Sequence, residues 1–188
     1  MRPRLVVLVA ACLAVVVAIA AYYRTRAAPR TPPPLSAFGT PANYSHLQFH
    51  KSLTQPEKEH ILDGRFVIVT KTEAFPATVK RAFAVITGQK QFALANPGEK
   101  YQVTDVVDEP GLPFRRLVFA GVRDDEWFIH YEHGGIGRSY EVVVFSIDSE
   151  KQLHFIWGGA GASGAKDFQE LRGMVSAGLF HDDAAYYW

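Results

Sequence analysis

The sequence predicts an α+β domain in which a curved antiparallel sheet of about five to six strands packs with two main helices. Three observations indicate this fold class. Segments with helical signals lie near the start and at the end of the folded part. Between them, short segments rich in β-formers follow one another with short polar turns, which is typical of antiparallel pairing. A long apolar segment before the domain predicts one N-terminal transmembrane or signal helix.

The apolar segment covers residues 5–23 and contains no charged side chain. A bilayer core about 30 Å thick needs about 20 such residues in a helix. Residues 1–4 supply the positive flank that signal peptides and signal anchors share. We expect an uncleaved anchor, because the apolar region of a cleaved signal is usually about 7–15 residues long. Cleavage after residues 18–20 and a lipoprotein box ending at Cys12 are the alternatives.

The domain boundaries follow from the composition behind this segment. Residues 24–41 are rich in proline and predict an extended spacer. Residues 42–188 have the size of one typical domain. Because short N-terminal tails usually stay inside, we expect a single-pass protein of the cell membrane with its C-terminal domain outside the cytoplasm. Cleavage of the signal would instead give a secreted or periplasmic protein.

The composition also limits the chemistry and the partners. Cys12, the only cysteine, lies in the apolar segment, which excludes a disulfide scaffold and a cysteine-ligated zinc site from the domain. His130 and His133 alternate to opposite faces of a regular strand, so we predict no metal site and no cofactor. A formal net charge of +1 without a basic stripe argues against nucleic acid. The expected partners are the lipid bilayer, through residues 5–23, and a small ligand or an envelope protein.

Three segments of the domain carry helix signals. Residues 54–57 fit a capping box before a short helix over about 55–62. Pro76 fits the first turn of a second helix, which Gly88 can end. In the last helix, over about 165–177, apolar residues recur at helical spacing.

Strands are expected at residues 65–71, 101–107, 115–122, 127–133, 140–147 and 153–157. The first of these is apolar on both sides, which predicts a strand buried on both faces. In the simplest hairpin registers, one face of the sheet carries Leu117, Phe119, Phe128, His130, Glu132, Tyr140, Val142, Val144, Phe155 and Trp157. The other face is also largely apolar, so we expect both faces to be covered, one by the helices and the other by sheet curvature, the N-terminal segment or another molecule.

The candidate site is the polar group on that first face. His130 and Glu132 are two residues apart on one strand, so their side chains lie on the same side about 7 Å apart. Tyr140 falls opposite Glu132. Together with Phe128 and Trp157, these residues predict a pocket for a small ligand. The alternatives are a hydrolase in which His130 and Glu132 act as general acid and base, and a simple ion pair at a wet sheet edge. A register slip of one residue would destroy the group.

Residues 159–164 match the pattern G-x-G-x-x-G between a strand and a helix. A dinucleotide-binding fold needs further parallel strands after that helix, and the sequence offers none. We therefore interpret the glycines as a turn or as a site of close backbone packing. An anion held at the start of the following helix is the alternative.

Overall fold

The computed structural model describes residues 51–107, 109–135 and 137–182. The predicted anchor at residues 5–23, the proline-rich linker and the aromatic tail at 183–188 lie outside the described residues. In the part of the chain that the structure describes, none of the helices has both the length and the apolar character that crossing a membrane requires.

One antiparallel sheet with the strand order β1-β7-β6-β5-β4-β3-β2 forms the middle of the domain. Its long strands run consecutively in sequence and in space: β3 (Arg115–Arg123), β4 (Glu126–His133), β5 (Ser139–Ile147) and β6 (Leu153–Gly161). Short strands form its two edges: β2 (Val67–Val69) on one side, and β7 (His181–Asp182) with β1 (Lys51–Ser52) on the other. The predicted α+β class and antiparallel meander are therefore confirmed.

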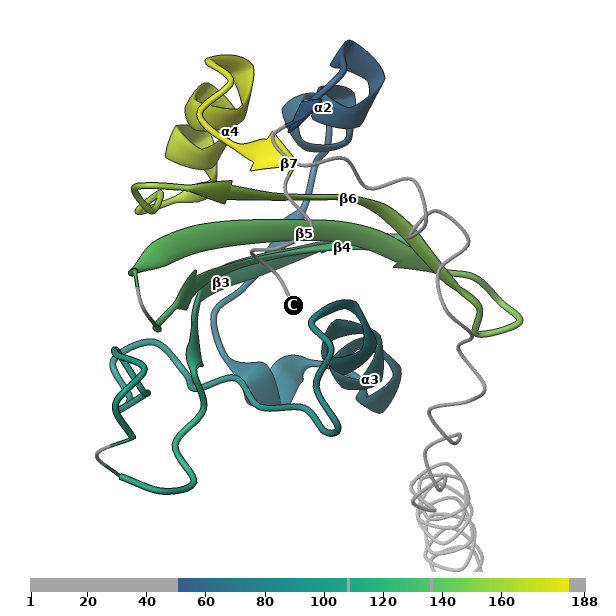
Figure 1. The fold of residues 1–188 in the computed structure, drawn as a ribbon. Helices are drawn as coiled ribbons and strands as arrows, with labels where there is room; N and C mark the ends of the chain where they lie inside the picture. Colours follow the sequence, from purple (N-terminus) through teal and green to yellow (C-terminus); the bar gives the residue numbers. More distant parts are fainter. Residues whose placement is uncertain (1–50, 108, 136, 183–188) are drawn as a thin grey trace, which may run out of the picture. The chain divides into compact units, whose positions relative to one another are not determined.

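Both faces of this sheet are covered, as expected, but helices cover both of them, whereas we expected helices on only one face. Figure 1 shows α2 (Gln55–Leu62) and α4 (Phe168–Ser176) on one side and α3 (Ala77–Ile86) on the other. A short 3₁₀ helix, η3 (Thr72–Ala74), leads into α3. The capping box that predicts α2 is present, since the Thr54 backbone N–H donates to the Glu57 carboxylate at 2.6 Å.

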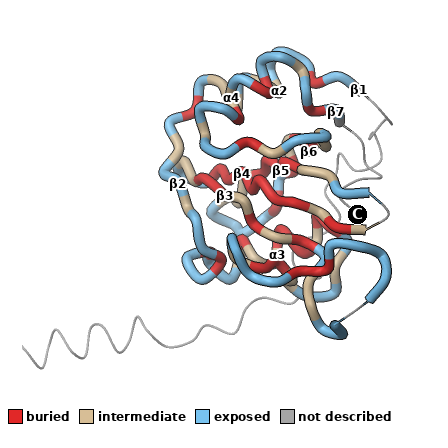
Figure 2. The backbone as a smooth tube through the Cα atoms, turned by 90° about the vertical axis from the view of Figure 1, so that its left-hand side faces the viewer, coloured by how far each residue is buried: buried red, intermediate tan, exposed pale blue. Residues whose placement is uncertain are grey.

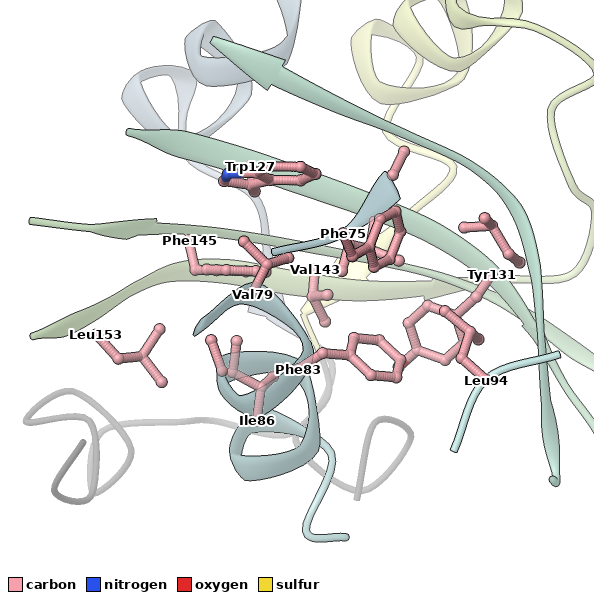
Figure 3. Packing of buried hydrophobic residues seen from close by; sticks show 14 of the residues in the cluster. Phe75, Val79, Phe83, Ile86, Leu94, Trp127, Tyr131, Val143, Phe145 and Leu153 are labelled. Atoms are coloured by element: carbon pink, nitrogen blue, oxygen red, sulfur yellow. The ribbon is translucent and has the colours of Figure 1, made fainter. Parts of the chain in front are cut away.

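Each face of the sheet has its own apolar core. Beneath α3, Val79 and Phe83 pack against Trp127, Tyr131 and Val143 from the central strands (Figure 3). The other core joins α2 and α4 to the opposite face; its buried strand residues are Phe119, Phe128, Val142, Val144 and Trp157. Buried positions consequently concentrate in the middle strands, whereas the outer loops are exposed (Figure 2).

Two predicted strands differ from the structure. In place of a strand buried on both faces, β2 is an edge strand with Val67 70% and Ile68 42% exposed, because it pairs only with β3. Residues 101–107 form no strand and contain only an isolated bridge from Thr104 to Gly135. Their valines are exposed, so the apolar pattern in this segment reflects a surface loop.

Two β-bulges change which residues lie on the predicted face of the sheet. One lies between Leu117 and Phe119, and the other is the extra residue of β6 between Phe155 and Trp157. Each adds one residue to its strand, which reverses the alternation of side chains. Leu117 and Phe155 therefore lie in the core beneath α3 and not on the predicted face. The register that pairs Glu132 with Tyr140 is as expected.

Candidate functional site

His130 is completely buried in the middle of the face that α4 covers. Its Nδ1 lies 2.9 Å from the carbonyl oxygen of Glu141, and its Nε2 lies 3.0 Å from the backbone N–H of Ala165. A carbonyl accepts and an amide N–H donates, so the partners assign a neutral ring with its proton on Nδ1. Burial lowers the pKa of His130 to about 4, against the opposing effect of the bond to the Glu141 carbonyl.

Through these two hydrogen bonds, the His130 ring links separate segments of the backbone. They attach the segment before α4, at Ala165, to the centre of the sheet. A general acid or base needs a ring nitrogen that reaches the substrate, and both nitrogens of His130 are occupied by the backbone. The geometry supports a structural role for His130 better than a catalytic one. Its assignment as a catalytic or ligand-binding residue stays a prediction.

Glu132 is also buried, and three side chains hold its carboxylate. Its Oε2 accepts from Arg116 Nη2 at 2.6 Å, and its Oε1 accepts from the Tyr101 hydroxyl at 2.5 Å and pairs with Arg138. Burial alone would raise the pKa of Glu132, but Tyr101 and the two guanidinium groups outweigh it and hold the pKa below its usual value. For Tyr101, burial and then the bond to Glu132 raise the pKa to about 12. We call these four residues the Glu132 cluster.

The other predicted ligand residues divide between this cluster and the core. The Tyr140 hydroxyl accepts from Arg138 Nη2 at 2.9 Å, so Tyr140 borders the Glu132 cluster. Phe128 stacks on Phe168 of α4 with ring centroids 5.3 Å apart. Trp157 is buried in the same apolar core. The structure thus brings His130, Glu132 and Tyr140 to one face, as predicted.

A hollow of about 360 Å³ opens beside the Glu132 cluster, and two residues of the cluster, Tyr101 and Arg116, form part of its wall. It is lined by Gly98, Glu99, Lys100, Tyr101, Gln102, Val103, Thr104, Glu109, Leu112 and Arg116. His130, Glu132 and Tyr140 are not among these lining residues. Sequence reasoning missed Tyr101 and Arg116 as site residues because it placed 101–107 in a strand. The two adjacent arginines at 115–116 were the one feature of the sequence that could have indicated this site.

A second polar group lies on the opposite face of the same strands. Glu141 is completely buried, and its Oε1 accepts hydrogen bonds from His133 Nδ1 and Ser139 Oγ, both at 3.0 Å. Its Oε2, Tyr131 Oη and Arg115 Nε form no hydrogen bond of good geometry, but the Tyr131 hydroxyl lies within reach of both the Glu141 and the Arg115 side chains. Burial raises the pKa of Tyr131 well above its usual value; the Glu141 charge adds to this shift and Arg115 opposes it. We call Arg115, Tyr131 and Glu141 the Arg115 cluster.

The glycine-rich segment serves close packing. A Cβ on Gly164 would lie 2.4 Å from Cδ1 of Tyr140, and a Cβ on Gly159 would lie 3.1 Å from Cβ of Phe180. Side chains of the same segment cap the backbone N–H groups at the start of α4. The Asp167 carboxylate accepts from the Glu170 N–H at 2.8 Å. The Glu170 carboxylate in turn accepts from the Lys166 N–H at 2.8 Å. These contacts support the packing interpretation and leave the anion hypothesis without a supporting contact.

The fold and the site together define an α+β domain with buried polar groups on both faces of one antiparallel sheet. Within the described ranges, no group of three or more histidine, cysteine, aspartate or glutamate side chains is placed to hold a metal ion. No protein-family model, curated protein or solved structure matches the chain.

Proposed function

We propose that the protein is a membrane-tethered, extracytoplasmic binding domain without catalytic activity. One observation carries this proposal: the side chains best suited to acid–base chemistry are used to hold the fold. Both ring nitrogens of His130 bond the backbone, and the carboxylate of Glu132 is held by Tyr101 and two arginines. The apolar residues 5–23 and the proline-rich residues 24–41 support the tether.

The partner that the surface fits is an envelope protein. Val103, Val106 and Val107 are 47%, 64% and 55% exposed on one loop. Phe114, 37% exposed, lies close to this loop, because the adjacent residues Gly134 and Gly135 donate backbone hydrogen bonds to Phe114 and Val103. We call these four side chains the valine patch. Neighbouring exposed apolar side chains are typical of protein-binding surfaces.

The charges beside the valine patch indicate what the partner presents. Within the Glu132 cluster, Arg116 and Arg138 share the single carboxylate of Glu132, which leaves one positive charge in excess there, whereas Asp105 on the loop of the valine patch and Glu99 at the hollow carry negative charges. Arg116 also lines the hollow, whereas Lys100 at its rim is already paired with Glu109 at 2.6 Å. An apolar segment whose acidic side chain reaches Arg116 or Arg138 would complement this surface.

Site-specific photo-crosslinking tests the proposal in cells that express the full chain. A photoreactive residue at Val106 should link one discrete membrane or envelope protein. The matched control is Leu179, which is 51% exposed and follows α4 on the other side of the sheet. Val107→Glu should reduce the product from position 106. Equal products from positions 106 and 179, or no product from either, would contradict the proposed function.

A further inference from the structure

We propose that the outer edge of β2 is a docking surface that binds an extended, apolar segment of a partner protein as an additional strand of the sheet. The inference is independent of the valine patch, because that patch has no residue on β2. Within the described residues, β2 pairs only with β3 and forms one edge of the sheet. Most of β2 is exposed (Figure 2), including 70% of Val67 and 42% of Ile68.

An edge of this kind offers unpaired backbone groups to a partner. Hydrogen-bonded and non-hydrogen-bonded pairs alternate along antiparallel strands, so every second residue of β2 directs its N–H and C=O groups away from β3. Natural sheets usually protect such edges with charged side chains or proline. The opposite edge, β1, follows this rule, because it consists of Lys51 and Ser52. The strand β2 consists of three apolar residues, so its edge lacks this protection.

The packing of its inner side holds this edge in place. Phe66, immediately before β2, packs against Phe128 with ring centroids 4.9 Å apart. Val69 packs against the core on the other face, beneath α3. The backbone is still extended at Lys71, where φ is −136° and ψ is 138°. A partner would therefore meet a preorganised edge, which reduces the entropy lost on binding.

The charges near the start of β2 indicate one end of the partner segment. The start of β2 pairs with the end of β3, beside the turn at residues 124–125 that leads into β4. Both residues of this turn are aspartates, and Asp63 precedes β2. Arg123 is paired with Glu126 at 3.0 Å, so Arg65 is the cation that remains against three carboxylates. A lysine or arginine of the partner would complement this end of the edge.

The other end of the edge leads into a hollow of about 780 Å³, which has room for the residues that precede the paired segment. It is lined by Thr70, Lys71, Glu73, Asn96, Pro97, Glu99 and Val118. Glu73 and Glu99 both accept from Asn96 Nδ2, at 2.9 and 3.1 Å. The charges of Lys71 and Lys80 act on Glu73, so two cations accompany two carboxylates here. The hollow therefore has no excess charge, and the basic end of the partner belongs beside the turn at 124–125.

A second copy of the chain fits this edge less well. Two β2 edges that pair antiparallel about Ile68 would place Arg65 of each copy opposite Lys71 of the other. Like charges directly opposite one another destabilise a strand pair. Antiparallel pairing with another protein avoids this contact and places the C-terminal end of its segment beside the start of β2. The segment that fits is therefore apolar, rich in strand-forming residues and basic at its C-terminal end.

Calorimetric titration of the full chain in detergent with capped synthetic peptides tests the site. The probe is a peptide of alternating threonine and valine that ends in two lysines, and the control peptide ends in two glutamates. We expect saturable binding of the lysine peptide and about tenfold weaker binding of the glutamate peptide. Bound lysine peptide should slow hydrogen exchange at residues 65–71, because N–H groups of the edge become hydrogen-bonded.

Two variants test the edge and the charges separately. Val67→Asn removes an apolar side chain from the edge and should weaken binding of the lysine peptide about fivefold. Its matched control is Val106→Asn, at a residue of the valine patch that is 64% exposed. This control should bind as the unmodified chain does. Asp125→Lys should reverse the preference, so that the glutamate peptide binds more tightly than the lysine peptide.

Thermal melts of each variant establish that it is folded. The proposal is overturned if the lysine peptide does not bind, or if Val67→Asn and Val106→Asn bind it equally. Exchange protection confined to segments outside residues 65–71, or an unchanged preference in Asp125→Lys, would also overturn it. A full chain that sediments as a dimer, with slow exchange at 65–71 before any peptide is added, would assign the edge to a second copy instead.

Discussion

Two buried glutamates near one end of the sheet show how differently one fold can use the same side chain. Glu132 and Glu141 are 2% and 0% exposed, on neighbouring strands and opposite faces. Glu132 has partners on both oxygens, from Tyr101, Arg116 and Arg138. Glu141 accepts hydrogen bonds from His133 and Ser139 on one oxygen, and its other oxygen has no hydrogen bond of good geometry. Burial alone therefore does not show whether a carboxylate is held by charged partners, as Glu132 is, or by a histidine and a hydroxyl, as Glu141 is.

The largest expected difference is between the two isosteric variants of these glutamates. Glu132→Gln should cost about 3–5 kcal/mol of unfolding free energy, because it removes the charge that pairs with two guanidinium groups. Glu141→Gln should cost about 1 kcal/mol or less, since an amide oxygen can still accept from His133 and Ser139. Urea unfolding of the full chain in detergent, followed by tryptophan fluorescence, measures both. Equal costs would mean that the contrast between the two clusters has no energetic basis.

The next effect is the pH dependence that His130 introduces. Its pKa is about 4 in the folded chain and 6.5 in the unfolded chain, so the unfolded state binds more protons between these values. The stability that neutral His130 contributes is complete above pH 6.5 and is lost as the pH falls towards 4. The full loss is about 3 kcal/mol. His130→Gln should unfold more easily near neutral pH and should lose this component of the pH slope.

A smaller effect separates two glycines of the C-terminal part. Gly164→Ala should cost about 1–3 kcal/mol, because its Cβ would meet the Tyr140 ring beside the Glu132 cluster. Gly173 lies in α4 with open space around its Cβ position. Gly173→Ala should therefore stabilise the domain by about 0.5–1 kcal/mol. The same urea experiment compares them, and a neutral Gly164→Ala would remove the close-packing interpretation.

The smallest expected change is that of Arg115→Met. It removes a buried guanidinium whose contact is with the neutral Tyr131 hydroxyl, so the unfolding free energy should change by only about 1 kcal/mol. Arg116→Met on the opposite face removes a bond to Glu132 and should cost about 1–3 kcal/mol. A larger cost for Arg115→Met than for Arg116→Met would contradict this difference between the two arginines.

Local signals predicted much of this fold. The capping box placed α2 at residues 55–62, and alternating side chains with polar turns predicted the meander. Strand alternation also brought His130, Glu132 and Tyr140 to one face, because β4 and β5 pair without a bulge. These features depend on neighbours in the sequence or on one short hairpin.

The remaining errors come from features that depend on distant contacts. The bulges in β3 and β6 moved Leu117 and Phe155 to the other face, and the apolar pattern does not indicate an inserted residue. The position of Tyr101 depends on Glu132, 31 residues away. Spacing placed His130 correctly but could not show that the backbone at Glu141 and Ala165 uses both its nitrogens.

The most direct test of the account is the protonation state of His130, because the proposed non-catalytic function depends on it. Nitrogen NMR of the full chain in detergent, with labelled histidine and His130→Gln for assignment, reports the tautomer and the pKa. We expect a neutral ring protonated on Nδ1 that does not titrate until the pH approaches 4. A ring that titrates near 6.5, or that carries its proton on Nε2, would show that His130 is not fixed by the backbone and would contradict the account.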